Sequence, residues 1–160
     1  GDFNTPQTSP SGFLGGMPLA MLVGRGHMGY MNGIGLAPIK ERNVILTDGR
    51  DLDPDESLVL RQSQVAHLQS VDDLLTTPLP DRPLYIHMDL DVVDPAEMPG
   101  LWYPTPGGPS VAAVNATLRR IVTEGTLAGA LFTLWNNSLV SDDRSLQHTL
   151  KMVRTIVDNA

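Results

Sequence analysis

The stretch from Tyr85 to Pro95 constrains the fold more than any other part of the chain. An apolar run leads into three acids, Asp89, Asp91 and Asp94, and a proline closes the stretch. Because strands that are buried on both faces read as apolar runs, the first half of the stretch predicts a buried strand. Side chains alternate faces along a strand, so His87, Asp89 and Asp91 are expected to point to the same side.

Two carboxylates on one face of a strand end repel each other and lose hydration. A bound divalent cation relieves both costs, and such ions prefer carboxylate oxygens as ligands. The alternative is that the acids make only a turn and a helix cap, because Asp-Pro is a common loop sequence. The spacing and the strand context favour metal binding by Asp89 and Asp91 over the turn-and-cap interpretation.

Composition limits the classes of partner. The chain has 160 residues, enough for one domain with a single core, and a net charge of −7, which disfavours nucleic acid and anionic membranes as partners. It has no cysteine, so disulfides and thiolate metal sites are excluded. No signal peptide is visible at Gly1–Asn4, and no apolar run approaches the ~20 residues of a membrane helix. We therefore expect a single-domain cytoplasmic protein.

Strands and helices are predicted to alternate along the chain. Strands are expected over 43–47, 84–90 and 127–135; helices over 17–23 and 57–68, after Ser70, between Ser110 and Gly125, and from Asp142 and Asp143 through Val157; and loops over 1–16, 24–42 and 95–109. This alternation predicts an α/β domain with a mainly parallel sheet. Ligands should lie at the carboxyl ends of the strands, where acidic loops follow Thr47, Leu90 and Trp135.

Three segments resemble the arginase/agmatinase (ureohydrolase) superfamily, in family order. Asp89-Leu90-Asp91-Val92-Val93-Asp94-Pro95 is similar to the D-x-D-x-x-D-P signature, and Pro106-Gly107-Gly108 matches the segment that follows it. The stretch from Asp2 to Gly12 resembles the sequence after the family's D-x-H-x-D metal motif. Arg50–Glu56 is similar to the loop that holds the substrate's α-amino group. The resemblance implies a three-layer α/β/α fold whose first strands are missing from this chain.

The resemblance also implies a reaction and a metal site. In this family two Mn²⁺ ions activate a bridging hydroxide, which attacks a guanidinium carbon and releases urea and an amine. Asp2, Asp89 and Asp91 match metal ligands, and Asp2 also matches the catalytic acid that orients the hydroxide. Asp94 is expected to fix the turn before Pro95 instead of binding metal. Homo-oligomers are usual in the family, and the partner is a small guanidino amino acid.

Four further residues match positions that bind substrate. Asn4 and Ser11 match residues that hydrogen-bond an α-carboxylate, and Asp53 and Glu56 match residues that contact an α-ammonium group. The structural alternative is that Asp53 and Glu56 only begin the following helix, where acids suit the helix dipole. The match favours an α-amino-acid guanidine over agmatine, which lacks the carboxylate.

The chain also departs from the family pattern. Gly15 stands where the family has a catalytic histidine, Leu134 (or Trp135) where a glutamate pairs with the guanidinium group, and Leu101-Trp102-Tyr103-Pro104 where T-G-T-P is usual. Because a charge buried without its partner is costly, an apolar wall favours a less basic group, such as the N-hydroxyguanidine of N-omega-hydroxy-arginine. The absent histidine also supports an alternative, a non-catalytic binding or assembly module.

Upstream ligands of the family are absent as well. Of six ligand positions this chain supplies three, so we expect the rest from a longer protein, in preference to a separately supplied piece or a lost site. The histidines do not replace them: His27, His67 and His148 are interpreted as surface or packing residues. His87 either orients the Asp89 carboxylate or is an ordinary core residue.

Overall fold

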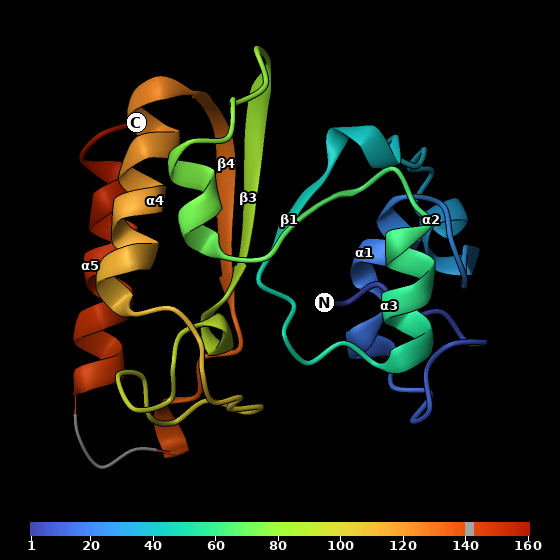
Figure 1. Ribbon diagram of the computed structural model, residues 1–160, viewed down its shortest axis with the longest axis horizontal. Helices are drawn as coiled ribbons and strands as arrows, with labels where there is room; N and C mark the ends of the chain where they lie inside the picture. The colour runs from blue at the N-terminus through green and yellow to red at the C-terminus, as the bar shows by residue number, and fades with distance from the viewer. Residues whose placement is uncertain (140–142) are drawn as a thin grey trace. The chain divides into compact units, whose positions relative to one another are not determined.

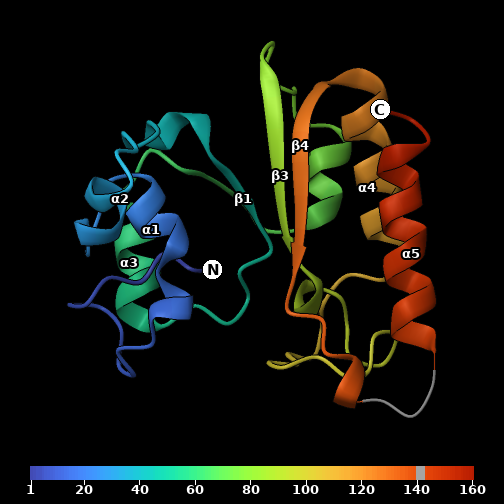
Figure 2. The ribbon, with the colours of Figure 1, turned by 180° about the vertical axis from the view of Figure 1, so that it is seen from behind.

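The computed structural model describes residues 1–139 and 143–160 and divides the chain into two compact units. The first unit is Gly1–Gln69 and the second unit is Ser70–Ala160. Figure 1 shows the elements of each unit in colours that follow the chain, and Figure 2 shows them from behind. The predicted helix start at Asp142 lies outside the described residues, but Asp143 is the residue that precedes the last helix.

The second unit is built on two long parallel strands. β3 (Pro83–Asp89) pairs with β4 (Thr126–Thr133) in a register that runs from Pro83 opposite Thr126 to Asp89 opposite Thr133. The 14-residue helix α4 (Val111–Glu124) packs against this strand pair, and the 14-residue helix α5 (Arg144–Val157) lies alongside α4 (Figures 1 and 2). Short 3-10 turns complete it: η3 (Val71–Leu75), η4 (Leu90–Val92) and η5 (Asn137–Leu139).

Local sequence explains where α4 begins and ends. The Ser110 hydroxyl accepts a hydrogen bond from Ala113 N at 3.1 Å, which satisfies a free amide of the first turn. Apolar residues of α4 at spacings of three and four join the core of the second unit, which includes Leu90, Val93, Met98, Val114, Leu118 and Met152. These predicted boundaries are confirmed.

The first unit has shorter elements. They are η1 (Leu14–Gly16), α1 (Pro18–Leu22), α2 (Gly29–Gly33), η2 (Glu41–Asn43), β1 (Ile45–Thr47), α3 (Pro54–Arg61) and β2 (Ala66–Leu68). β1 and β2 pair in parallel, with Ile45 opposite Ala66. The fully buried side chains of this unit's small core include Phe3, Ala20 and Leu60. Both strand pairs are parallel, and this confirms the predicted α/β class with a mainly parallel sheet.

One predicted helix is wrong at both ends, since α3 begins at Pro54 and not at Ser57. The helix expected over 57–68 stops at Arg61, and residues 66–68 form strand β2. The Ser63 hydroxyl donates to Leu60 O at 2.7 Å and accepts from Val65 N at 3.1 Å, so a side chain takes over the backbone groups that would continue the helix. His67 therefore lies on a strand. The loop expected over 24–42 likewise contains the short helix α2.

Among the described residues, no helix is both long and apolar enough to cross a membrane.

Candidate metal and substrate site

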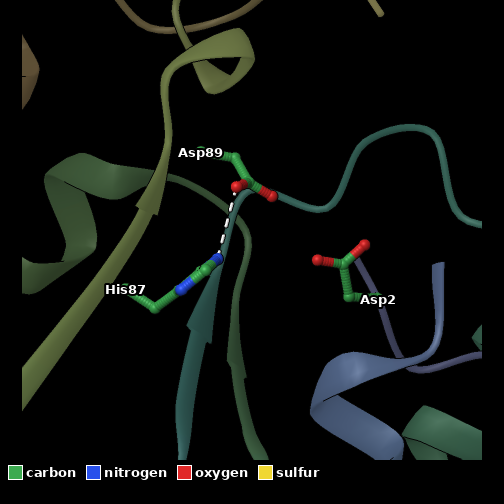
Figure 3. A group of neighbouring side chains, drawn as sticks. All are labelled: Asp2, His87 and Asp89. Carbon is green, nitrogen blue, oxygen red and sulfur yellow. Dashed lines mark hydrogen bonds and ion pairs between the residues drawn. The ribbon is translucent and has the colours of Figure 1, made fainter. Parts of the chain in front are cut away.

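Asp89 ends strand β3 and carries two side-chain hydrogen bonds on one oxygen. Its Oδ1 accepts from His87 Nε2 at 3.2 Å (Figure 3) and from the Thr133 hydroxyl, which ends the paired strand β4. Burial raises the pKa of the Asp89 carboxyl, but the hydrogen bonds from His87 and Thr133 outweigh it, so the pKa lies below its usual value. Asp89 is therefore a carboxylate at neutral pH, as a metal ligand must be.

The position of His87 decides between its two interpretations. Its side chain is 46% exposed, so the alternative of an ordinary core histidine is wrong. Its ring nitrogen contacts the Asp89 carboxylate, which is the contact that an orienting role requires.

Asp91 lies outside strand β3, so the alternation argument does not apply to it. β3 ends at Asp89, and Asp91 lies in the 3-10 turn η4. Strand periodicity therefore cannot determine where the Asp91 carboxylate points, and the half-buried residue takes its position from η4.

Asp94 fixes the loop that follows Pro95, whereas the sequence predicted that it fixes the turn before Pro95. Its Oδ1 accepts from Ala96 N at 2.9 Å and its Oδ2 from Gly107 N at 2.8 Å, while its own amide donates to Pro109 O at 3.1 Å. One carboxylate thus closes both ends of the proline-rich stretch. Gly107 takes a φ of 82°, which favours glycine there.

Two departures from the family pattern meet at the end of β4. Leu134 adopts a left-handed φ of 63°, and Trp135 forms an isolated antiparallel bridge with Leu101. Trp102 and Tyr103 beside this bridge are 56% and 54% exposed. Large exposed aromatic side chains gathered at one place usually mark a binding surface. In the sequence these two departures are separate segments, whereas the backbone bridge between Leu101 and Trp135 brings the segments together.

In the first unit, Asp2 is held by its backbone. Its carbonyl oxygen accepts from Leu19 N at 3.0 Å and from Ala20 N at 3.2 Å, so the first turn of α1 anchors the residue. Asp2 adopts a left-handed φ of 58°, which costs a non-glycine residue of order 1 kcal/mol. Such strain is concentrated at functional sites in proteins.

Three of the four substrate-binding candidates lie together in the first unit. Asn4 Nδ2 donates to Asp53 Oδ2 at 2.9 Å and to Glu56 Oε2 at 3.2 Å. Glu56 also accepts from Phe3 N at 2.8 Å and from Asp53 N at 3.1 Å, and it is only 3% exposed. Asp53 and Glu56 form a capping box at the start of α3, so the helix-start interpretation describes their geometry.

The fourth candidate, Ser11, belongs to an exposed loop. Its hydroxyl accepts from Phe13 N at 3.2 Å and lies 3.4 Å from the Ser9 hydroxyl. Gly15 is exposed in the short turn η1 that follows. These residues therefore form a surface loop beside the start of α1.

Sequence reasoning missed two residues. Thr133 could have been found from the parallel register, because the last residues of paired strands lie opposite each other. Asp48 follows β1 with a φ of 67° and pairs with Arg50 at 2.6 Å. Burial raises the pKa of the Asp48 carboxyl in spite of the Arg50 guanidinium group beside it. The acidic loop was recognised, but the burial of Asp48 was not.

Comparison with known proteins identifies relatives. The arginase family model matches residues 1–156. The arginase of Bacillus subtilis (strain 168) is 31% identical over 98% of this chain and 57% of its own length. The N(omega)-hydroxy-L-arginine amidinohydrolase of Streptomyces lavendulae is 31% identical over 92% of this chain and 52% of its own length.

Solved structures agree with this. A crystal structure of the arginase from Bacillus subtilis subsp. subtilis str. 168 matches with a TM-score of 0.90 and 28% identity, over all of this chain and 60% of that one. The predicted fold class is thereby confirmed. The chain spans a little over half the length of the curated relatives that it matches.

Proposed function

Because this chain belongs to the arginase family, we propose that the whole protein hydrolyses the C–N bond of a guanidino amino acid. Water adds to the guanidine carbon, the bond to the side-chain nitrogen breaks, and that nitrogen leaves protonated as the amine of ornithine. The second product is urea from arginine or hydroxyurea from N-omega-hydroxy-arginine. The family match over nearly the whole chain is the observation that carries this proposal.

We propose Mn²⁺ as the metal, with two ions in the complete site and Asp2, Asp89 and Asp91 as ligands from this chain. The donor set fits, since carboxylate oxygens suit this hard cation. Asp89 has a lowered pKa, and both of its hydrogen bonds end on Oδ1, which leaves Oδ2 for an ion. When bound, the metal pair would supply a hydroxide at neutral pH. His87 and Thr133 would keep the Asp89 carboxylate ionised and oriented.

We propose that Asn4, Ser11, Asp53 and Glu56 bind the amino-acid end of the substrate. The hydrogen bonds among Asn4, Asp53 and Glu56 support a preorganised polar cluster, because each side chain holds the next in place. Glu56 is buried, so its contribution would be to orient Asn4 and Asp53. Asp53 and Glu56 can cap α3 and also bind substrate, because acids are favoured at the N-terminus of a helix by its dipole.

For the guanidino end, we propose a preference for N-omega-hydroxy-arginine over arginine. Leu134 and the exposed aromatic side chains near it supply no anion to pair with a fully charged guanidinium group. A hydroxylated guanidine is less basic, so binding it without a pairing anion costs less free energy than binding a fully charged guanidinium group. The relatives do not distinguish the two substrates, because an arginase and an N-hydroxyarginine hydrolase are both 31% identical to this chain.

The test is an assay of the full-length protein with Mn²⁺ and each substrate, following ornithine release. We expect turnover of both substrates, with N-omega-hydroxy-arginine preferred, and a loss of at least ~100-fold in Asp89→Asn, a ligand substitution. Leu134→Glu should move the preference toward arginine. An unchanged substrate ratio in Leu134→Glu would refute the apolar-wall argument while leaving the hydrolase proposal intact.

A second candidate, a non-catalytic binding or assembly module, draws on Gly15 in the place of the family's histidine. Metal analysis separates the two: two Mn²⁺ per subunit together with turnover would exclude the module. A metal-free and inert full-length protein would instead exclude the enzyme. We also propose a homo-oligomer, which sedimentation of the full-length protein would detect.

A further inference from the structure

A groove on the second unit lies between α4 and α5, on elements that the proposed function does not use. It is an open groove with a volume of about 680 Å³. Its lining includes Arg119 from α4, His148, Lys151, Arg154 and Thr155 from α5, and Asp158 directly after α5. The groove is thus a place where a small ligand could bind.

The charge of the groove is opposite to that of the chain. Arg119, Lys151 and Arg154 face a single acid, Asp158, in a chain whose net charge is −7. Within the described part of the chain, the side chains of these three cations make no ion pair and no hydrogen bond. Like charges gathered in one groove repel each other, so an anion that binds there is attracted by all three.

The helix dipole does not account for this arrangement. A cation in the last turn of a helix stabilises it, and this explains Arg154 on α5. It does not explain Arg119, which lies in the middle of α4. The helix dipole therefore does not explain why cations of both helices line the groove.

The two helices hold the groove rigidly. The buried Thr155 hydroxyl on α5 donates to Asn115 Oδ1 on α4 at 2.9 Å, and Asn115 Nδ2 donates to Val111 O at 2.9 Å. This buried chain of hydrogen bonds fixes the register of the two helices on the groove side. Cations on fixed backbones lose less freedom when they bind a ligand.

We propose that this groove binds a small multivalent anion, one that carries phosphate groups or several carboxylates. Arg119 and Arg154 provide planar guanidinium donors that match the oxygens of phosphate or carboxylate groups. Lys151 adds a third positive charge to the groove. The excess negative charge elsewhere on the chain opposes a long polyanion such as nucleic acid, which would extend beyond the groove. The ligand is therefore expected to be small.

The test uses the full-length protein and inorganic pyrophosphate as the probe, by calorimetry at low ionic strength and by amide chemical shifts. The combined variant Arg119→Gln, Lys151→Gln should weaken binding about tenfold for each cation removed. Lys40→Gln, an exposed site in the first unit with the same charge change, should change the affinity by less than about twofold.

Several outcomes would overturn the proposal. Absence of binding of both pyrophosphate and a tricarboxylate would do so, and so would equal losses in Lys40→Gln and in the groove variants, which would indicate only a general charge effect. Tricarboxylate as a second probe separates the two sources of charge: binding of one probe alone identifies the preferred group. Light scattering without any anion provides the remaining check, since self-association abolished by the groove variants would assign the groove to a second copy of the chain. None of these results depends on hydrolase activity.

Discussion

The two units of this chain are stabilised in different ways. The second unit has strands of seven and eight residues, two 14-residue helices and a contiguous apolar core. The first unit has three-residue strands and a small core, and its buried Glu56 accepts hydrogen bonds from three separate donors. Periodic apolar burial therefore organises the second unit, whereas long-range polar contacts organise the first.

The largest expected effect tests the apolar core of the second unit. Leu118 is 3% exposed in α4, so Leu118→Ala should lower the free energy of unfolding by about 3 kcal/mol through lost burial and a cavity. Both tryptophans, Trp102 and Trp135, lie in this unit, so tryptophan fluorescence in urea reports it. The matched control Val157→Ala is at a side chain 68% exposed and should change stability by less than about 0.5 kcal/mol. Equal effects of the two substitutions would contradict the comparison.

The next effect tests the polar network of the first unit. Glu56→Gln replaces a carboxylate that accepts from Phe3 N, Asp53 N and Asn4 Nδ2, and one oxygen cannot satisfy all three donors. We expect a loss of about 2 kcal/mol, with faster hydrogen exchange at the Phe3 amide. Asp55→Asn, an exposed acid in the same helical turn, is the control. Unchanged protection of Phe3 in Glu56→Gln would show that the network contributes little.

A smaller effect concerns the cap of α4. Ser110→Ala removes the acceptor for Ala113 N and should cost about 1 kcal/mol, detected by tryptophan fluorescence in urea. Ser110→Asp keeps an acceptor at this position and should retain most of the stability. If both substitutions cost the same, the side-chain hydrogen bond is not the stabilising feature of this helix start.

The smallest effect is the pH dependence due to Asp48. Because burial raises the pKa of this carboxyl in the folded chain, the folded state holds the proton more tightly than the unfolded state, whose ordinary value is 3.8. The contribution of Asp48 to the free energy of unfolding is therefore present at low pH, and it declines as the pH rises through the raised pKa of the folded state. Asp48→Asn should remove that decline, measured as the free energy of unfolding of both proteins between about pH 3 and pH 7. A difference between them that stays constant with pH would contradict the assignment.

Much of the second unit could be predicted from sequence. The strand that ends at Asp89, the helix between Ser110 and Gly125, and the last helix through Val157 all follow from spacing and caps. These signals are local, since each depends on residues within one or two turns or along one strand. The contact of the Asp94 carboxylate with Ala96 N is of the same kind, whereas its contact with Gly107 N joins residues 13 positions apart.

Other features required the tertiary structure. Strand β2 was predicted as helix, because its three residues become a strand only by pairing with β1. Thr133 reaches Asp89 only through the register of β3 and β4, and Glu56 is buried only by contact with residues more than fifty positions away. By itself, the sequence determined the parallel α/β class and the acids at the end of β3, because periodicity and charge are local properties. The structure decided which partners those acids have, because hydrogen bonds between distant segments depend on how the chain has already folded.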